Sequence, residues 1–322
     1  MGTSDDTGQG PSLEPVTQQF IDSMASQPWQ HTVTPDEARA LLARLQSVPA
    51  GRPSAQIDDI TLPAGPTGSV QIRIVRPRDA AGPLPVVIYC HGGGWISGDA
   101  GTHDRLIREI AVGAKAALVF VSHDRSPEAQ YPVAVEQVYA AMLHVVANAQ
   151  ALDVDAMRLA VVGDGTGGTI AAAVTLMARQ RRGPRIELQV LICPVTDAAC
   201  DTGSYRRFAD GPWLTAAAML RAWEAYLPDP ARRGEITAAP FAASLDELAN
   251  LPDALVIVAE NDVARDEGEG YAQKLSDAGV RVTSVRYNGT IHDFVLLNAL
   301  ADTPAARGAI AQIIGALGDA FG

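Results

Sequence analysis

A glycine-flanked turn in the middle of the chain has the pattern of a nucleophile elbow but lacks a nucleophile. The apolar run at 159–162 leads into Gly163-Asp164-Gly165-Thr166-Gly167-Gly168, and small, helix-forming residues follow. A strand, a tight turn and a helix in this order hold the central residue of G-x-S-x-G at the turn apex, where a serine attacks acyl groups. Here Gly165 takes the place of that serine. The sequence therefore predicts an acyl-transfer site without the residue that forms the acyl intermediate.

The same segment contains a G-x-G-x-x-G pattern, which would favour a loop that binds a dinucleotide phosphate. Two observations weigh against that interpretation. Asp164 would place a negative charge beside the phosphate, and no acidic residue follows at the spacing that binds a ribose. We therefore predict no nucleotide and no other cofactor.

A second pattern that can do chemistry is the glycine triplet of H-G-G-G-W, from His91 to Trp95. It directly follows the apolar run 86–90, which is typical of a strand buried on both faces. Three successive glycines allow a sharp turn and leave backbone N–H groups uncovered, so they can donate to a developing oxyanion. A flexible loop would be the plainer interpretation, but the position after a central strand favours the oxyanion hole.

Strands that alternate with helices must position these turns. Helical patterns separate successive apolar runs, and this alternation predicts a doubly wound, mostly parallel sheet of the α/β class. The expected strands are 86–90, 117–122, 158–162, 186–192, 254–259 and 281–286, and the expected helices include 104–111, 134–147 and 168–179. A hairpin of alternating strands, 57–63 and 69–76, precedes them.

The chain is expected to form one domain, 13–322, after a disordered tail at 1–12. Helical patterns at about 13–50 and an aromatic-rich insertion at about 200–235 interrupt the alternation, and together they predict a helical cap. A cap over the carboxyl ends of the strands would cover the place where an open α/β sheet binds ligands. Aromatic residues at helical spacing also occur in cores, so that alternative stays open.

Five separate motifs resemble those of the bacterial esterases of the hormone-sensitive lipase family, over roughly residues 15–320. Besides the glycine triplet and the elbow, they are Asp124-Arg125-Ser126-Pro127-Glu128, Asp262-Val263-Ala264-Arg265-Asp266-Glu267-Gly268 and Ile291-His292-Asp293-Phe294. The resemblance implies an α/β-hydrolase fold. It also implies that Asp262 is the triad acid and His292 the triad base, in the chain order that this fold uses.

The resemblance further implies an oxyanion hole formed by Gly92, Gly93 and the N–H of Thr166. The Thr166 hydroxyl lies one residue past the elbow apex and is expected to point away from His292, so it does not replace the serine. The candidate pocket residues are His91, Trp95, His123, Asp164 and Trp213. A surface acid at 262 and an inert core histidine at 292 would be the alternative.

Three functions remain compatible with these residues. His292, oriented by Asp262, could act as an acid–base catalyst on a small acyl or carbonyl compound without an acyl-serine, by elimination, cyclisation, isomerisation or water-mediated hydrolysis. The chain could instead be a carboxylesterase or acetyl esterase inactivated by loss of its nucleophile, whether natural or engineered. It could also be a non-catalytic ligand-binding protein. The intact His91, glycine triplet, Asp262 and His292 disfavour this last function.

Composition limits the partners and the location. The net charge of −12 and the pI near 4.9 disfavour nucleic acid and anionic membranes. Three cysteines, Cys90, Cys193 and Cys200, are too few and too irregularly spaced for a zinc site or a disulfide framework, so we predict no metal. Without a signal peptide or an apolar run of membrane-spanning length, the expected location is the cytoplasm. The resemblance to the esterase family also implies a candidate homodimer site at the exposed edge strand near the C-terminal helix.

Overall fold

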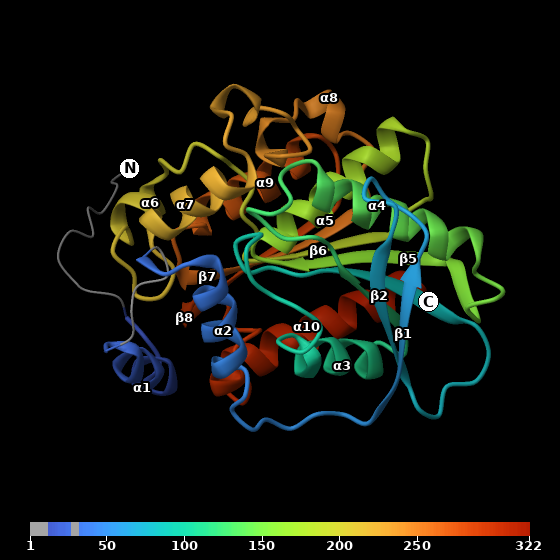
Figure 1. Ribbon diagram of the computed structural model, residues 1–322, viewed down its shortest axis with the longest axis horizontal. Coiled ribbons are helices and arrows are strands. Elements are labelled where there is room, and N and C mark those ends of the chain that lie inside the picture. Colours follow the sequence, from blue (N-terminus) through green and yellow to red (C-terminus); the bar gives the residue numbers. More distant parts are fainter. Residues whose placement is uncertain (1–11, 27–31) are drawn as a thin grey trace.

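A mostly parallel sheet of eight strands forms the centre of the computed structural model, which describes residues 12–26 and 32–322 (Figure 1). The strand order is β1-β2-β4-β3-β5-β6-β7-β8; β1 pairs antiparallel with β2, β2 pairs antiparallel with β4, and every later pair is parallel. The strands are β1 Ala55–Leu62, β2 Val70–Pro77, β3 Leu84–Cys90, β4 Ala117–Ser122, β5 Val154–Asp164, β6 Leu188–Ile192, β7 Asp253–Asn261 and β8 Val282–Ile291.

Helices cover both faces of this sheet. Figure 1 shows α3 and α10 together on one side, with α4, α5 and α9 on the other. The helices and short 3-10 turns are α1 Pro15–Met24, α2 Pro35–Leu45, α3 Asp104–Gly113, α4 Val133–Ala147, α5 Thr166–Gln180, α6 Gly203–Arg207, α7 Ala216–Tyr226, η2 Pro230–Arg232, η3 Pro240–Ala242, α8 Leu245–Leu248, α9 Arg265–Asp277, η4 Asn298–Leu300 and α10 Pro304–Phe321.

The central strands are apolar on both faces because helices pack on each side. Every residue of β3 and of β6 is buried, and so is α5 from Thr166 to Ala178. The small side chains of α5 allow it to lie close to β3, β5 and β6. This core fixes the carboxyl ends of β3, β5 and β7, where the candidate site residues follow.

The doubly wound fold, the N-terminal hairpin and the six expected strands that follow it are confirmed. The apolar run at 281–286 differs from the prediction in one respect. It was expected to resemble strands buried on both faces, but β8 lies at the sheet edge, where most of its residues are exposed or half-buried. An edge strand has a neighbour on one side only, so its polar positions face solvent.

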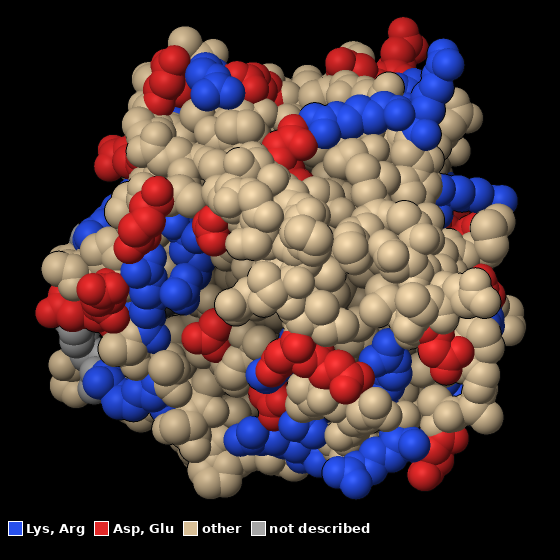
Figure 2. All heavy atoms as spheres, turned by 45° about the vertical axis from the view of Figure 1, so that its right-hand side comes forward, with Lys and Arg blue, Asp and Glu red and all other residues tan. Residues whose placement is uncertain are grey.

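Eleven of the twelve residues in the predicted disordered tail, residues 1–11, lie outside the described residues. Within 12–26 and 32–322, no helix combines the length and apolarity needed to cross a bilayer. On the face shown in Figure 2, acidic and basic side chains alternate around a broad area of uncharged residues.

Candidate active site

The elbow between β5 and α5 places Gly165 at its apex with φ 53° and ψ −121°. Residues that carry a side chain rarely adopt this backbone conformation, whereas glycine does so without a steric penalty. The Gly165 N–H donates to Ile192 O at 2.8 Å, and Gly165 O accepts from Val195 N–H at 3.2 Å. Both backbone groups of the apex residue are therefore fixed by the segment that ends β6.

The flanking glycines are required by close backbone contacts. A β-carbon on Gly163 would lie 2.2 Å from Gly167 O, and one on Gly167 would lie 2.1 Å from Cys90 O. At Gly165 the situation differs, because a β-carbon there would meet only the His292 ring, with Nε2 at 3.1 Å. The apex position thus faces His292 directly and can take a small side chain after a shift of a few tenths of an ångström.

Gly165→Ala is expected to lower the free energy of unfolding by about 1–3 kcal/mol, because alanine must adopt a strained positive φ. Urea unfolding followed by circular dichroism measures this change. Gly315→Ala in α10 is the matched control: a β-carbon there meets no atom within 4 Å, so its stability should stay the same or rise slightly. An unchanged midpoint for Gly165→Ala would show that the apex is not strained for side chains.

His292 and Asp262 form a buried hydrogen-bonded pair beside this apex. Asp262 follows β7 and His292 follows β8, and His292 Nδ1 lies 2.7 Å from Asp262 Oδ2. Burial lowers the pKa of His292, but the negative charges of Asp262 and Asp293 and the hydrogen bond to Asp262 outweigh burial and raise that pKa to about 9. The pair has the geometry of an imidazole base oriented by a carboxylate.

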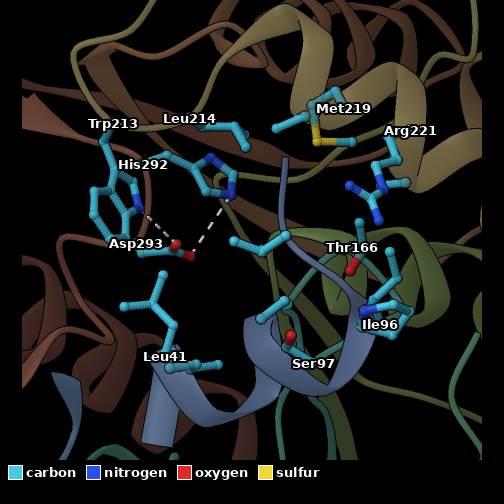
Figure 3. Close-up of a pocket in the computed structure, with 18 of the residues that line it drawn as sticks. Leu41, Ile96, Ser97, Thr166, Trp213, Leu214, Met219, Arg221, His292 and Asp293 are labelled. Atoms are coloured by element: carbon cyan, nitrogen blue, oxygen red, sulfur yellow. Dashed lines mark hydrogen bonds and ion pairs between the residues drawn. The ribbon is translucent and has the colours of Figure 1, made fainter. Parts of the chain in front are cut away.

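Asp293 is a second carboxylate beside the same ring, and the sequence did not single it out as a site residue. Its Oδ1 lies 3.6 Å from His292 Nε2, and its Oδ2 accepts a hydrogen bond from Trp213 Nε1 at 3.0 Å. Figure 3 shows both interactions on the cavity side of the imidazole. Asp293 adopts φ 63°, which turns its side chain back toward His292, and no periodicity in the sequence indicates such a turn.

The oxyanion loop differs in detail from the prediction. The Gly92 N–H was expected to face the oxyanion, but it donates to Asp164 Oδ1 at 3.2 Å. The glycines that line the cavity are Gly93 and Gly94, opposite Thr166 at the first turn of α5. The backbone N–H of Thr166 has no partner within its helix, as at any helix start. The candidate oxyanion donors are therefore the N–H groups of Gly93, Gly94 and Thr166.

Asp164 is an anchor for the oxyanion loop and does not line the cavity. Its Oδ1 accepts from Tyr89 Oη at 2.8 Å, and its Oδ2 lies 3.3 Å from His103 Nε2. Burial raises the pKa of Asp164, but the charge and hydrogen bonds of its partners outweigh burial and lower it. Asp164 was predicted to belong to the substrate pocket, whereas the structure places its carboxylate beneath the loop, against Tyr89, His103 and the Gly92 N–H.

Three other predicted pocket residues are also buried behind the cavity. The rings of His91 and His123 stack on each other with centroids 4.0 Å apart, and burial lowers the pKa of both. The Trp95 ring stacks on Tyr226 with centroids 4.1 Å apart, and the Trp95 backbone N–H donates to Thr166 Oγ1. These contacts hold the oxyanion loop in place. Of the five predicted pocket residues, only Trp213 lines the cavity.

The cavity itself is largely apolar and has a volume of about 890 Å³, including solvent at its mouth. Apolar side chains from α2 and α7 form two of its walls, and the oxyanion loop and His292 form its floor (Figure 3). Its principal apolar lining residues are Val33, Leu41, Leu42, Leu45, Leu214 and Met219. Arg221, Asp293 and His292 are its charged or titratable lining residues. Such a cavity fits a small, mostly apolar ligand that presents one polar group to its floor.

Cys193, which follows β6, completes a buried group of potential metal ligands with Asp262 and His292. One donor atom from each of the three residues lies within 4.8 Å of the others. Asp262 and His292 are already hydrogen-bonded to each other at 2.7 Å, a separation that leaves no space for an ion between those two atoms. We therefore assign this group to the acid–base pair.

Comparison with known proteins agrees with this architecture. Residues 87–296 match the family described as alpha/beta hydrolase fold. Carboxylesterase NlhH of Mycobacterium tuberculosis is 33% identical over 311 residues, which cover 95% of this chain and 96% of that protein. Ethyl acetate hydrolase of Pseudomonas putida is 32% identical over 277 residues, covering 84% and 86%.

A solved structure of a thermostable esterase from Pseudomonas putida superposes with a TM-score of 0.95. It is 42% identical in sequence and covers 98% of this chain and 99% of its own. The chain therefore belongs to the α/β-hydrolase fold family. Its relatives include carboxylesterases, and its sheet, elbow and His292–Asp262 pair agree with that class of enzyme.

Proposed function

We propose that this protein acts on a small ester or related carbonyl compound by His292–Asp262 acid–base chemistry, without an acyl-enzyme intermediate. The observation that carries this proposal is the orientation of His292. Its Nδ1 is bound by Asp262, and its Nε2 lies 3.1 Å from the position that a β-carbon on Gly165 would take, where an elbow normally holds its nucleophile. Gly165 has no group that could accept an acyl chain.

In the simplest reaction, a water molecule takes the place of the side-chain hydroxyl. His292 Nε2 removes a proton from this water while the water oxygen attacks the ester carbonyl carbon. The N–H groups of Gly93, Gly94 and Thr166 stabilise the resulting oxyanion. The bond to the alcohol oxygen then breaks, that oxygen takes the proton from His292, and a carboxylic acid and an alcohol leave. The same base could remove a proton beside a carbonyl group and give elimination, cyclisation or isomerisation.

The apolar lining of the cavity favours substrates with a small apolar part. The walls from α2 and α7 act as a cap over the floor, and His292, Asp293 and Arg221 are the charged or titratable groups along the lining. The esterase relatives and the order of the sequence motifs support a place in the branch that resembles hormone-sensitive lipase. p-Nitrophenyl acetate is a suitable first substrate because its acyl group is small.

Turnover is expected to rise about tenfold per pH unit from about pH 7 and to level off near pH 9, because only the neutral imidazole is a base. The sign follows from the raised pKa of His292. At neutral pH both ring nitrogens carry a proton, and the cationic ring cannot act as a base. Initial rates from pH 6 to 10, corrected for spontaneous hydrolysis, measure this profile. A flat or falling profile in the same range would contradict the assignment of His292 as the base.

The relatives favour a second candidate, an esterase that has lost turnover together with its nucleophile. Removing a triad member from a hydrolase leaves about 10³- to 10⁴-fold acceleration over water from the oxyanion hole and binding alone. The two candidates differ in their dependence on the base. In the proposed function, p-nitrophenyl acetate hydrolysis by the unaltered protein requires His292, whereas residual acceleration by the oxyanion hole does not. Loss of turnover in His292→Ala supports the proposed function, and unchanged turnover supports the second candidate.

A further inference from the structure

The imidazole of His292 lies between two carboxylates, one at each ring nitrogen. Asp262 Oδ2 is 2.7 Å from Nδ1, and Asp293 Oδ1 is 3.6 Å from Nε2. The Asp262 side chain has no exposed surface, whereas that of Asp293 is 20% exposed and lines the cavity. Nε2 is also the atom that must take the proton in the proposed reaction. Asp293 therefore stands at the reacting side of the ring.

Asp293 is fixed in this position by its own contacts. Its backbone has φ 63°, and its carbonyl oxygen accepts hydrogen bonds from the N–H groups of Leu296 at 2.8 Å and Leu297 at 2.9 Å. The Trp213 indole donates to Oδ2, which leaves Oδ1 directed at His292 (Figure 3). The carboxylate is thus held beside Nε2 from two sides, by the loop after β8 and by the segment before α7.

We infer that Asp293 is a positioning residue that holds His292 in its doubly protonated form until a substrate or an attacking water displaces the carboxylate from Nε2. This inference extends the proposed function by assigning a control over its base. In an enzyme with an elbow serine, the hydroxyl is the partner of Nε2. With Gly165 at that position, the Asp293 carboxylate lies 3.6 Å from Nε2 instead, and its negative charge favours the cationic ring, which a neutral hydroxyl does not do.

The other groups around His292 do not duplicate this effect. Asp164 at the end of β5 adds a weaker field, and the Cys193 thiol after β6 has a pKa raised by burial and stays neutral. Arg221 of α7 lines the same cavity. Asp262 acts on the opposite nitrogen. Asp293 is therefore the group whose removal changes the field at Nε2 while leaving the Nδ1 hydrogen bond in place.

Asparagine is the matched substitution at this position. It tolerates a positive φ, and its amide oxygen can still accept the Trp213 hydrogen bond, so Asp293→Asn removes the charge and little else. Asp293→Glu keeps a charge beside the ring and serves as the charge-retaining variant. Asp302→Asn, at an exposed position of the same loop region, is the control for the loss of one negative charge elsewhere.

The test is an NMR titration of the ring nitrogens of His292 in the free protein, which needs no turnover. We expect the midpoint in Asp293→Asn to fall by about 1 pH unit, with Asp293→Glu and Asp302→Asn close to the unaltered protein. A midpoint in Asp293→Asn within about 0.2 units of the unaltered protein would overturn the inference. Equal falls in Asp293→Asn and Asp293→Glu would also overturn it, because a disturbed loop would then be the cause.

The pH–rate profile provides a second readout and separates this inference from the proposed function. If Asp293 controls the base, the rise in p-nitrophenyl acetate hydrolysis moves to lower pH in Asp293→Asn by the same shift as the NMR midpoint. A shifted NMR midpoint without any His292-dependent turnover supports the role of Asp293 and refutes the proposed function. Turnover that depends on His292, together with an unshifted midpoint, supports the proposed function and refutes the role of Asp293.

Discussion

Gly165→Ser is expected to raise kcat/KM for p-nitrophenyl acetate by about 10³- to 10⁶-fold, the range by which loss of a triad serine lowers hydrolase activity. The physical reason is that a serine β-carbon at the apex would lie 3.1 Å from His292 Nε2, which places its hydroxyl beside the base. The oxyanion donors of Gly93, Gly94 and Thr166 are already arranged around the same apex. Steady-state rates measure the gain, and a burst of p-nitrophenol would report the new acyl-enzyme.

Gly165→Ala is the matched control for this gain. Alanine has the same β-carbon and the same backbone strain but no hydroxyl, so its activity should not rise. A folded Gly165→Ser protein with a gain below about tenfold and no burst would show that the cavity does not present esters to the elbow. The serine variant should also lose stability as the alanine variant does, because both place a side chain at a positive φ.

His292→Ala is expected to lower turnover of p-nitrophenyl acetate by the unaltered protein by about 10²- to 10⁴-fold, the usual contribution of a general base. No other described histidine lines the cavity: His91, His103 and His123 are buried beneath the oxyanion loop, and His144 lies on α4. Initial rates near pH 10, where the imidazole is largely neutral, give the greatest sensitivity.

His144→Ala controls for the loss of a histidine away from the site and should leave turnover unchanged. If His292→Ala retains the full rate above spontaneous hydrolysis, the acid–base role of His292 is refuted and ligand binding becomes the better explanation of the intact cavity. Circular dichroism of both variants separates loss of the base from loss of the fold.

Much of the fold follows from patterns that depend only on burial. The continuous apolar runs at 86–90 and 254–259 predict central strands, because they are too short for a buried helix and helical patterns flank them. The elbow can also be predicted from the sequence, because its flanking glycines form a recognisable pattern. The structure gives the reason for that pattern: any β-carbon at Gly163 or Gly167 would meet backbone atoms. Asp262 and His292 then fall at the ends of β7 and β8, where parallel strands share one edge of the sheet.

The details of the oxyanion loop could not be predicted in the same way. The rotation of single peptide units determines which glycine N–H groups face the cavity. Asp164 turns the Gly92 N–H away from the cavity by accepting its hydrogen bond. Likewise, His91, His123 and Trp95 have side chains suited to a pocket, but ring stacking places them beneath the loop. Such contacts arise between segments far apart in the chain and leave no periodic signal.

Asp293 illustrates the same limit at the catalytic ring. The residue after the base could point to solvent or toward Nε2, and only its positive φ and the hydrogen bond from Trp213 decide the matter. The two residues are 80 positions apart. His292 can therefore be identified from the sequence, whereas the second carboxylate beside its ring cannot.

The most direct test of a reaction without an acyl-enzyme is intact-protein mass spectrometry of the unaltered chain, quenched during turnover of p-nitrophenyl acetate. The expected result is product formation without a burst, with the protein mass unchanged, while Gly165→Ser treated in parallel carries an acetyl group. A stoichiometric acetyl adduct on the unaltered chain that forms and decays at the rate of turnover would contradict the proposed function.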